Sequence, residues 1–239
     1  MAQSLIKKLD KVERIEVDED DNSVMNISFP VSKVPGKVVI EAEKVTKSYG
    51  DKTILKDISL LVERGSKIAF VGQNGQGKST FIKAIVNEFE FQGEIKLGHN
   101  VQVGYFAQTH AHPEFESKTL LEILWQEHSL QLGPAKSVLR KYEIDGQAEQ
   151  KFSSLSGGQQ ARFQVLLLEL MGSTALLLDE PTDNLDLASA ESLEAALNRY
   201  EGTVLAVTHD RWFTRGFTRF LIFGANGRVY ESPEPIFDH

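Results

Sequence analysis

The segment GQNGQGKST, residues 72–80, has the residue types and the spacing of a loop that binds phosphate groups. Its glycines let the backbone fold tightly, so that successive N–H groups point inward at phosphate oxygens. Lys78 would supply a positive charge to the β- and γ-phosphates of a nucleotide, and the Ser79 hydroxyl would ligate Mg²⁺. The segment therefore predicts a site for a nucleoside triphosphate and its metal ion.

An apolar run, IAFVG, precedes this loop, and a helical pattern follows it. Phosphate binding at a helix N-terminus requires this order of strand, loop and helix. A glycine-rich turn with an exposed lysine is the alternative, and the flanking pattern argues against it. We predict nucleotide contacts from Gly72, Gln73, Asn74, Gly75, Gln76, Gly77, Lys78, Ser79 and Thr80.

Two carboxylates, Asp179 and Glu180, directly follow an apolar run in ALLLDEPTDNLD, residues 175–186. Ligands of open α/β sheets bind outside the carboxyl ends of the strands, so we expect this pair beside the phosphate loop. Asp179 is placed to hold Mg²⁺ through a water ligand. Glu180, on the opposite face because side chains alternate along a strand, would activate the attacking water as a general base. Two solvated carboxylates are the alternative, which the phosphate loop weakens.

Three further residues stand near the ends of other predicted strands. We predict that His209 contacts the γ-phosphate and holds Glu180 and the water in line, although a lone histidine is more often structural. Gln108 is predicted to be a metal ligand and a sensor for the adjoining lobe. Tyr49 would stack on an adenine, with ordinary packing as the alternative.

Apolar segments alternate with helical ones from residue 38 onward, which predicts an α/β core with a parallel sheet. The segment at 220–231 contains an NG turn and predicts a C-terminal hairpin. A helical stretch within about 109–171 would be an inserted lobe. We predict a domain over 38–239, preceded at 1–37 by a linker with a short helix and an extended, acidic and proline-containing part; a solvated tail is the alternative.

Composition limits the classes of protein that the chain can represent. Its 239 residues are 41% hydrophobic and 25% charged, enough for one large domain. No apolar run approaches the roughly 20 residues of a membrane helix, and the start lacks the apolar region of a secretory signal. Zero cysteines exclude disulfides and thiolate metal sites. The net charge of −8 argues against a broad nucleic-acid surface. We expect a cytoplasmic protein without membrane insertion or sequence-specific nucleic-acid binding.

Taken in chain order, these motifs resemble the nucleotide-binding domain of ATP-binding cassette (ABC) proteins over about residues 38–231. The resemblance rests on Tyr49, GQNGQGKST, Gln108, LSGGQ, LLLDEPT, the loop at 184–186 and His209. It implies a P-loop NTPase fold with a parallel core sheet, an N-terminal antiparallel β part and an inserted helical lobe. It also implies ATP and Mg²⁺ as cofactors, ATP hydrolysis, and a second ABC domain as partner.

The resemblance also assigns roles to single residues. Ser79, Gln108 and Asp179 would serve the metal, Glu180 would activate water, and His209 would act as a switch. Asn184 and Asp186 would lie in a loop that communicates across a dimer. In ABC-F members, a soluble group of the superfamily, Asn-His usually precedes the Leu-Asp of this loop. In this chain Asp183 and Asn184 precede Leu185 and Asp186.

The segments VERIEVDEDD and THDRWF look like the ABC-F group. Those proteins join two such domains by a long helical linker, and many act on the ribosome in translation or in antibiotic protection. The chain resembles the C-terminal domain with the tail of that linker, so its partner would be a second copy or a missing N-terminal half. The alternatives are the cytosolic ATPase subunit of a membrane transporter and a nucleotide-dependent clamp with little turnover.

The loop LSGGQQARF, residues 155–163, is glycine-rich but has no lysine. In a head-to-tail pair, Ser156, Gly157 and Gly158 would close over the γ-phosphate held by Lys78 of the partner subunit. The helix that starts at Gln159 would supply positive dipole there. We therefore expect this loop to be half of a shared site.

Overall fold

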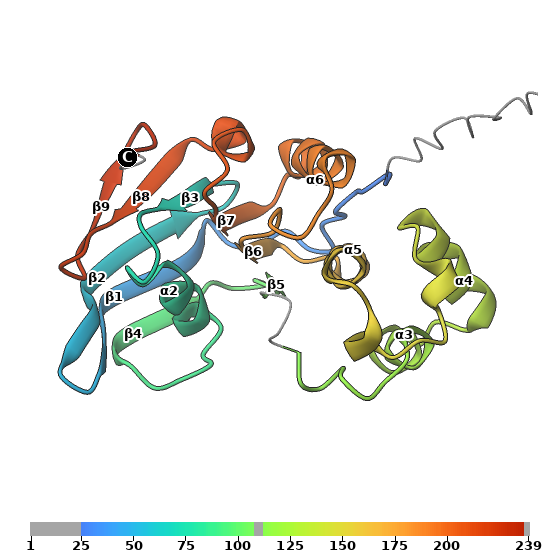
Figure 1. The fold of residues 1–239 in the computed structure, drawn as a ribbon. Coiled ribbons are helices and arrows are strands. Elements are labelled where there is room, and N and C mark those ends of the chain that lie inside the picture. The colour runs from blue at the N-terminus through green and yellow to red at the C-terminus, as the bar shows by residue number, and fades with distance from the viewer. Residues whose placement is uncertain (1–24, 108–111, 237–239) are drawn as a thin grey trace, which may run out of the picture.

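The computed structural model describes residues 25–107 and 112–236. Within this part the strands form a three-stranded sheet, ordered β2-β1-β4, and a six-stranded sheet, ordered β5-β6-β7-β3-β8-β9. Figure 1 shows the three-stranded sheet below the β8–β9 end of the six-stranded sheet, and helices α3 and α4 at the opposite side of the view, beyond β5 and β6. The predicted α/β fold with an antiparallel β part and a helical lobe is confirmed.

The six-stranded sheet is the core of the domain. Its first five strands run parallel, and β9 pairs antiparallel with β8, as the NG hairpin predicts. Every residue of β6 and β7 is buried, which explains their unbroken apolar sequence. The strands are β3 (Lys67–Val71), β5 (Val103–Phe106), β6 (Ala175–Asp179), β7 (Thr203–Val207), β8 (Arg219–Phe223) and β9 (Val229–Ser232).

The three-stranded sheet consists of β1 (Val38–Tyr49), β2 (Lys52–Glu63) and β4 (Gln92–Leu97), with β1 antiparallel to both neighbours. Helix α2 (Lys78–Ile85) lies between the two sheets and shares one apolar core with them. Phe81 and Ile82 of α2 are fully buried in that core. The helix that follows the phosphate loop is therefore anchored from both sides.

The helical lobe lies beyond β5 and β6 (Figure 1). A capping box formed by Thr119 and Glu122 begins α3 (Leu120–His128). The other helices of the described residues are α4 (Leu132–Lys141), α5 (Gly157–Met171) and α6 (Leu187–Arg199), with short 3₁₀ turns η1 (Asp145–Gln147), η2 (Phe152–Ser154) and η3 (Phe213–Gly216). None of the helices in the described ranges is long and apolar enough to cross a membrane.

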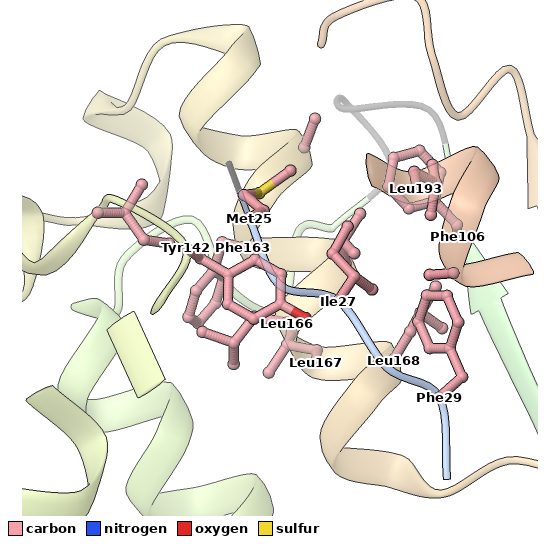
Figure 2. Close-up of a cluster of buried hydrophobic side chains, with 14 of the residues drawn as sticks. Met25, Ile27, Phe29, Phe106, Tyr142, Phe163, Leu166, Leu167, Leu168 and Leu193 are labelled. Atoms are coloured by element: carbon pink, nitrogen blue, oxygen red, sulfur yellow. The ribbon is translucent and has the colours of Figure 1, made fainter. Parts of the chain in front are cut away.

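The described part of the predicted linker, residues 25–37, differs from the expectation of an arm outside the domain. Met25, Ile27 and Phe29 are buried in the core of the lobe, and exposed residues alternate with them. Figure 2 shows these three side chains lying over α5, close to Phe163, Leu166, Leu167 and Leu168. Alternating apolar residues in an extended segment present one face for burial, which the acidic and proline-rich neighbourhood obscures in the sequence.

Backbone hydrogen bonds hold the same segment in place. The Ser28 amide donates to Glu169 Oε2 at 3.3 Å, and the Ser32 amide donates to the Gly172 carbonyl at 3.1 Å. The Arg199 side chain of α6 donates to the Ile27 carbonyl at 3.3 Å. Residues 25–32 therefore join α5 and α6. The predicted helix within residues 3–16 lies outside the described residues, and the domain boundary at residue 37 stays a prediction.

Candidate active site

A cavity of about 550 Å³ opens where β3, β6 and β7 end and β1 reaches the same edge. Its lining combines residues from four separate loops and strand ends: Tyr49, Lys52, Ile54, Asn74, Gly75, Gly77, Lys78, Ser79, Thr80, Glu180, Asp183 and His209. Three of these residues, Lys52, Ile54 and Asp183, were not predicted from the sequence. Lys52 and Ile54 lie at the start of β2, so their proximity follows from the tight turn after Tyr49.

The phosphate loop runs from the end of β3 into α2. Gly77 precedes α2 in the left-handed region, with φ at 95°, and a Cβ there would come within 2.8 Å of a Leu55 methyl group. Gly72 is equally confined, because a Cβ would lie 2.7 Å from the Phe223 carbonyl oxygen. Only glycine fits both positions, so the backbone can turn tightly through the loop and into the N-terminus of α2. Within the loop, the Gln73 amide donates to Gln76 Oε1 at 2.6 Å. This cradle fits a polyphosphate.

Lys78 is buried at the first position of α2. Its ammonium donates to the carbonyl oxygens of Gly72 at 2.6 Å and Gln73 at 2.9 Å. Burial lowers the pKa of Lys78, and the nearby carboxylates of Glu180 and Asp179 oppose that shift. The cation is thus held over the loop, where a phosphate would meet it.

Ser79 and Asp179 come together from α2 and the end of β6, one hundred residues apart in the sequence. The Ser79 hydroxyl donates to Asp179 Oδ1 at 2.8 Å. Burial raises the pKa of Asp179, and this hydrogen bond opposes the shift. A hydroxyl and a carboxylate form an oxygen donor set of the kind that Mg²⁺ takes together with water and substrate phosphates. The pair therefore fits the predicted magnesium ion.

Gln108, the third predicted metal residue, lies outside the described residues. The segment before it, β5, pairs parallel with β6. Its role as a ligand and sensor stays a prediction.

Glu180 follows β6 directly and has a left-handed backbone, with φ at 48°. Strand β6 ends before Glu180, so the alternation of side chains along a strand does not set the direction of this side chain. The left-handed backbone at Glu180 directs it into the cavity. The side chain is 9% exposed. Burial, followed by the neighbouring Asp183 carboxylate, raises the pKa of Glu180 to about 7. A carboxyl group with this pKa can accept a proton from water near neutral pH.

His209 lies across the cavity at the end of β7 and contacts Glu180 twice. Its backbone amide donates to Glu180 Oε2 at 3.3 Å, and its Nε2 lies 3.1 Å from Glu180 Oε1. The same Nε2 lies 2.9 Å from Asn74 Oδ1. Burial and then the Lys78 ammonium lower the pKa of His209, which favours the neutral ring. Because two acceptors face Nε2, we assign the ring proton to that nitrogen.

The loop LSGGQ begins α5 and lies away from these groups. The Ser156 side chain accepts from the Gln159 amide at 3.3 Å, and the Gln159 side chain accepts from the Ser156 amide at 3.0 Å. Gly157 and Gly158 lie against Asn184, since a Cβ on either would come within 3.1 Å of that residue. Among the described residues that line the cavity, none comes from this loop.

Arg162, which the sequence analysis did not single out, links this loop to two other segments. Its guanidinium forms ion pairs with Glu143 and with Asp186. Asp186 also caps α6 by accepting from the Ser189 amide at 2.9 Å. Partial burial raises the pKa of Asp186, but the hydrogen bonds from Arg162 and Ser189 outweigh it and lower the pKa to about 2. The predicted dimer loop is therefore tied to the N-terminal end of α5.

A protein-family model described as ABC transporter matches residues 55–183, more than half of the 239 residues. The match contains the phosphate loop, LSGGQ and the pair Asp179 and Glu180. The predicted motifs up to residue 183 thus lie within the part of the chain that the family model matches.

Curated relatives match most of this chain. An antibiotic resistance protein of Mycobacteroides abscessus is 51% identical over 193 residues, which are 72% of this chain and 35% of that protein. ABC transporter F family member 2 of Arabidopsis thaliana is 37% identical and covers 96% of this chain and 35% of its own length. The energy-dependent translational throttle protein EttA of Haemophilus influenzae is 30% identical and covers 87% and 39%. The chain spans less than half the length of these relatives.

A solved structure shows the same arrangement of elements. It is a dimeric ATP-binding cassette in a post-hydrolysis state, bound to ADP and Pi, with a TM-score of 0.65 and 25% identity. The match covers 81% of this chain and 98% of that chain. The chain therefore corresponds to one nucleotide-binding domain.

Proposed function

Because this chain belongs to the ABC transporter family, as an ATPase domain with relatives among the F members, we propose that it pairs head-to-tail around ATP and serves translation. The pairing partner is a second copy or another ABC domain. Hydrolysis of ATP in the shared site then separates the pair. The domain works in the cytoplasm, as part of a translation-associated or ribosome-protection factor.

The position of the LSGGQ loop is the main observation that supports head-to-tail pairing. Ser156 and Gly157 are exposed at the start of a helix, with their loop held by a capping box and by Asn184. A rigid glycine-lined helix N-terminus is a site for an anion, and the chain's own cavity does not use it. The phosphates bound at Lys78 of the partner subunit would supply that anion. The dimeric structure of a related cassette supports this arrangement.

The cavity residues divide the chemistry among them. Lys78 and the loop amides bind the phosphates, and Ser79 and Asp179 hold the metal, which when bound offsets phosphate charge. Tyr49 stacks on the base. Glu180 takes the proton of the attacking water, and the His209 ring orients that carboxylate through its Nε2 contact.

The pKa of Glu180 sets the expected pH dependence of this reaction. Because burial and Asp183 raise that pKa to about 7, the base is mostly protonated below pH 7 and ionised above it. We expect kcat for ATP hydrolysis to rise through about pH 7 and to fall about tenfold for each pH unit below it. Measuring kcat at saturating ATP and Mg²⁺ across this range tests the assignment.

Asp183→Asn provides the matched comparison. Removal of the neighbouring carboxylate lowers the pKa of Glu180, so the acid limb should move to lower pH while its slope is unchanged. An acid limb that Asp183→Asn leaves in place would contradict the assignment of Glu180 as the titrating base.

The names of the relatives support the translational role. One is an energy-dependent translational throttle protein and another is an antibiotic resistance protein. We expect Glu180→Gln, which holds the ATP state, to co-sediment with 70S ribosomes in the presence of ATP and Mg²⁺ more than with ADP. Membrane vesicles serve as the parallel arm. Nucleotide-dependent binding to vesicles and none to ribosomes would favour a transporter subunit.

A further inference from the structure

The ring of Tyr49, at the mouth of the cavity, has a cation over one of its faces. Lys47 Nζ lies 5.1 Å from the centroid of the Tyr49 ring and 4.5 Å from the centroid of the Phe89 ring. The same ammonium donates to the Glu90 carbonyl oxygen at 2.6 Å. One cation therefore connects the end of β1 with the segment between α2 and β4.

The sequence places Lys47 where it can do this. Lys47 and Tyr49 are two residues apart in β1, a spacing that directs both side chains to one face of a strand. Phe89 and Glu90 follow α2, whose first turn carries Lys78. Lys47 thus fixes the ring relative to the same helix that binds the phosphates.

Tyr49 needs such support because it is 55% exposed and stands immediately before a turn. An exposed tyrosine without neighbours samples several rotamers, and holding one of them costs entropy when a ligand binds. A cation over one face and a second aromatic ring beyond it restrict the ring before binding. The opposite face is then available to a planar group.

We propose that Lys47 is a positioning residue that holds Tyr49 for stacking on the nucleobase of the bound nucleoside triphosphate. This inference rests on the proposed function, because it assumes that Tyr49 receives a base. Lys47 itself is not among the residues that line the cavity. Replacing Lys47 should therefore change the affinity for a ligand that contains the base and leave the affinity for the phosphates unchanged.

Inorganic tripolyphosphate separates the two parts of the ligand, because it has the phosphates and no base. We expect Lys47→Ala to weaken ATP binding about two- to fivefold, the size of one exposed cation–π contact, while tripolyphosphate binding is unchanged. Lys47→Arg should bind ATP like the wild type, since a guanidinium also stacks on aromatic rings. Lys56→Ala, an exposed lysine of β2 outside the cavity lining, is the matched control and should change neither affinity. Isothermal titration of the full chain measures all of these.

A double-mutant cycle tests whether Lys47 acts through Tyr49. With Tyr49→Ala as background, adding Lys47→Ala should cause no further loss of ATP affinity. Equal losses in both backgrounds, or a parallel loss of tripolyphosphate affinity, would overturn the inference. Tighter ATP binding by Lys47→Ala would also overturn it, because Lys47 would then cover the face that the base uses.

Binding of ATP and tripolyphosphate by the wild type shows whether a negative result contradicts this inference or the proposed function. A wild type that binds neither ATP nor tripolyphosphate contradicts the proposed function, and the inference falls with it. A wild type that binds ATP, together with a Tyr49→Ala variant that binds it more weakly and a Lys47→Ala variant that binds it as the wild type does, contradicts only the inference.

Discussion

Replacing Glu180 with glutamine is expected to slow ATP hydrolysis about 10²- to 10⁴-fold, the usual loss when a general base is removed. ATP should still bind, because glutamine keeps the size of the side chain and removes a negative charge from a cavity that receives phosphates. The ATP-bound pair should then accumulate, since the reaction that separates it is slow. Steady-state hydrolysis and size-exclusion chromatography with ATP and Mg²⁺ measure both effects.

Glu127→Gln makes the same chemical change on an exposed residue of α3, outside the cavity lining, and should behave like the wild type. If Glu180→Gln binds ATP but stays monomeric, pairing on ATP is the wrong model. If it hydrolyses ATP at the wild-type rate, another group serves as the base.

Lys78→Ala is expected to act at the earlier step, by weakening nucleotide binding. Its ammonium lies over the phosphate loop at the start of α2. A hydrogen bond that involves a charged group contributes about 1.5 to 3 kcal/mol, so ATP affinity should fall about 10- to 100-fold. Equilibrium titration with ATP measures the loss. Unchanged ATP affinity would exclude Lys78 from the phosphate site.

A mixture of two impaired variants, Lys78→Ala and Ser156→Ala, tests whether the site is shared between subunits. Lys78→Ala destroys the phosphate side and Ser156→Ala weakens the LSGGQ side of each site. In a mixed head-to-tail pair, one of the two sites combines the intact Lys78 with the intact Ser156. We expect the mixture to hydrolyse ATP faster than either variant alone.

The control is a mixture of Lys78→Ala with the variant that carries both substitutions, because no site in that pair has an intact Lys78. It should show no gain. A first mixture that is no faster than its components would indicate that each chain completes its own site.

The phosphate loop was predictable because its structure depends on local sequence. Glycine permits the left-handed turn at Gly77, a buried strand precedes the loop, and a helix follows it. The contact between Ser79 and Asp179 spans one hundred residues, yet it was also predictable. Parallel strands end at the same edge of a sheet, so a general rule of α/β folds brings these two residues together.

Other contacts of the domain were decided only by the tertiary structure. Glu180 enters the cavity through a left-handed residue that strand alternation does not foresee. The two carboxylates that pair with Arg162 come from two other segments, and the buried face of residues 25–29 is hidden in a proline-containing sequence.

By itself, then, the sequence determined the α/β fold, the phosphate loop and the carboxylates beside it, because glycine conformation and apolar periodicity act over a few residues. Only the folded chain determined that Lys47 reaches Phe89 and Glu90 and that the segment at 25–32 bridges α5 and α6. Such contacts depend on the packing of side chains that are distant in sequence, and no local pattern encodes that packing.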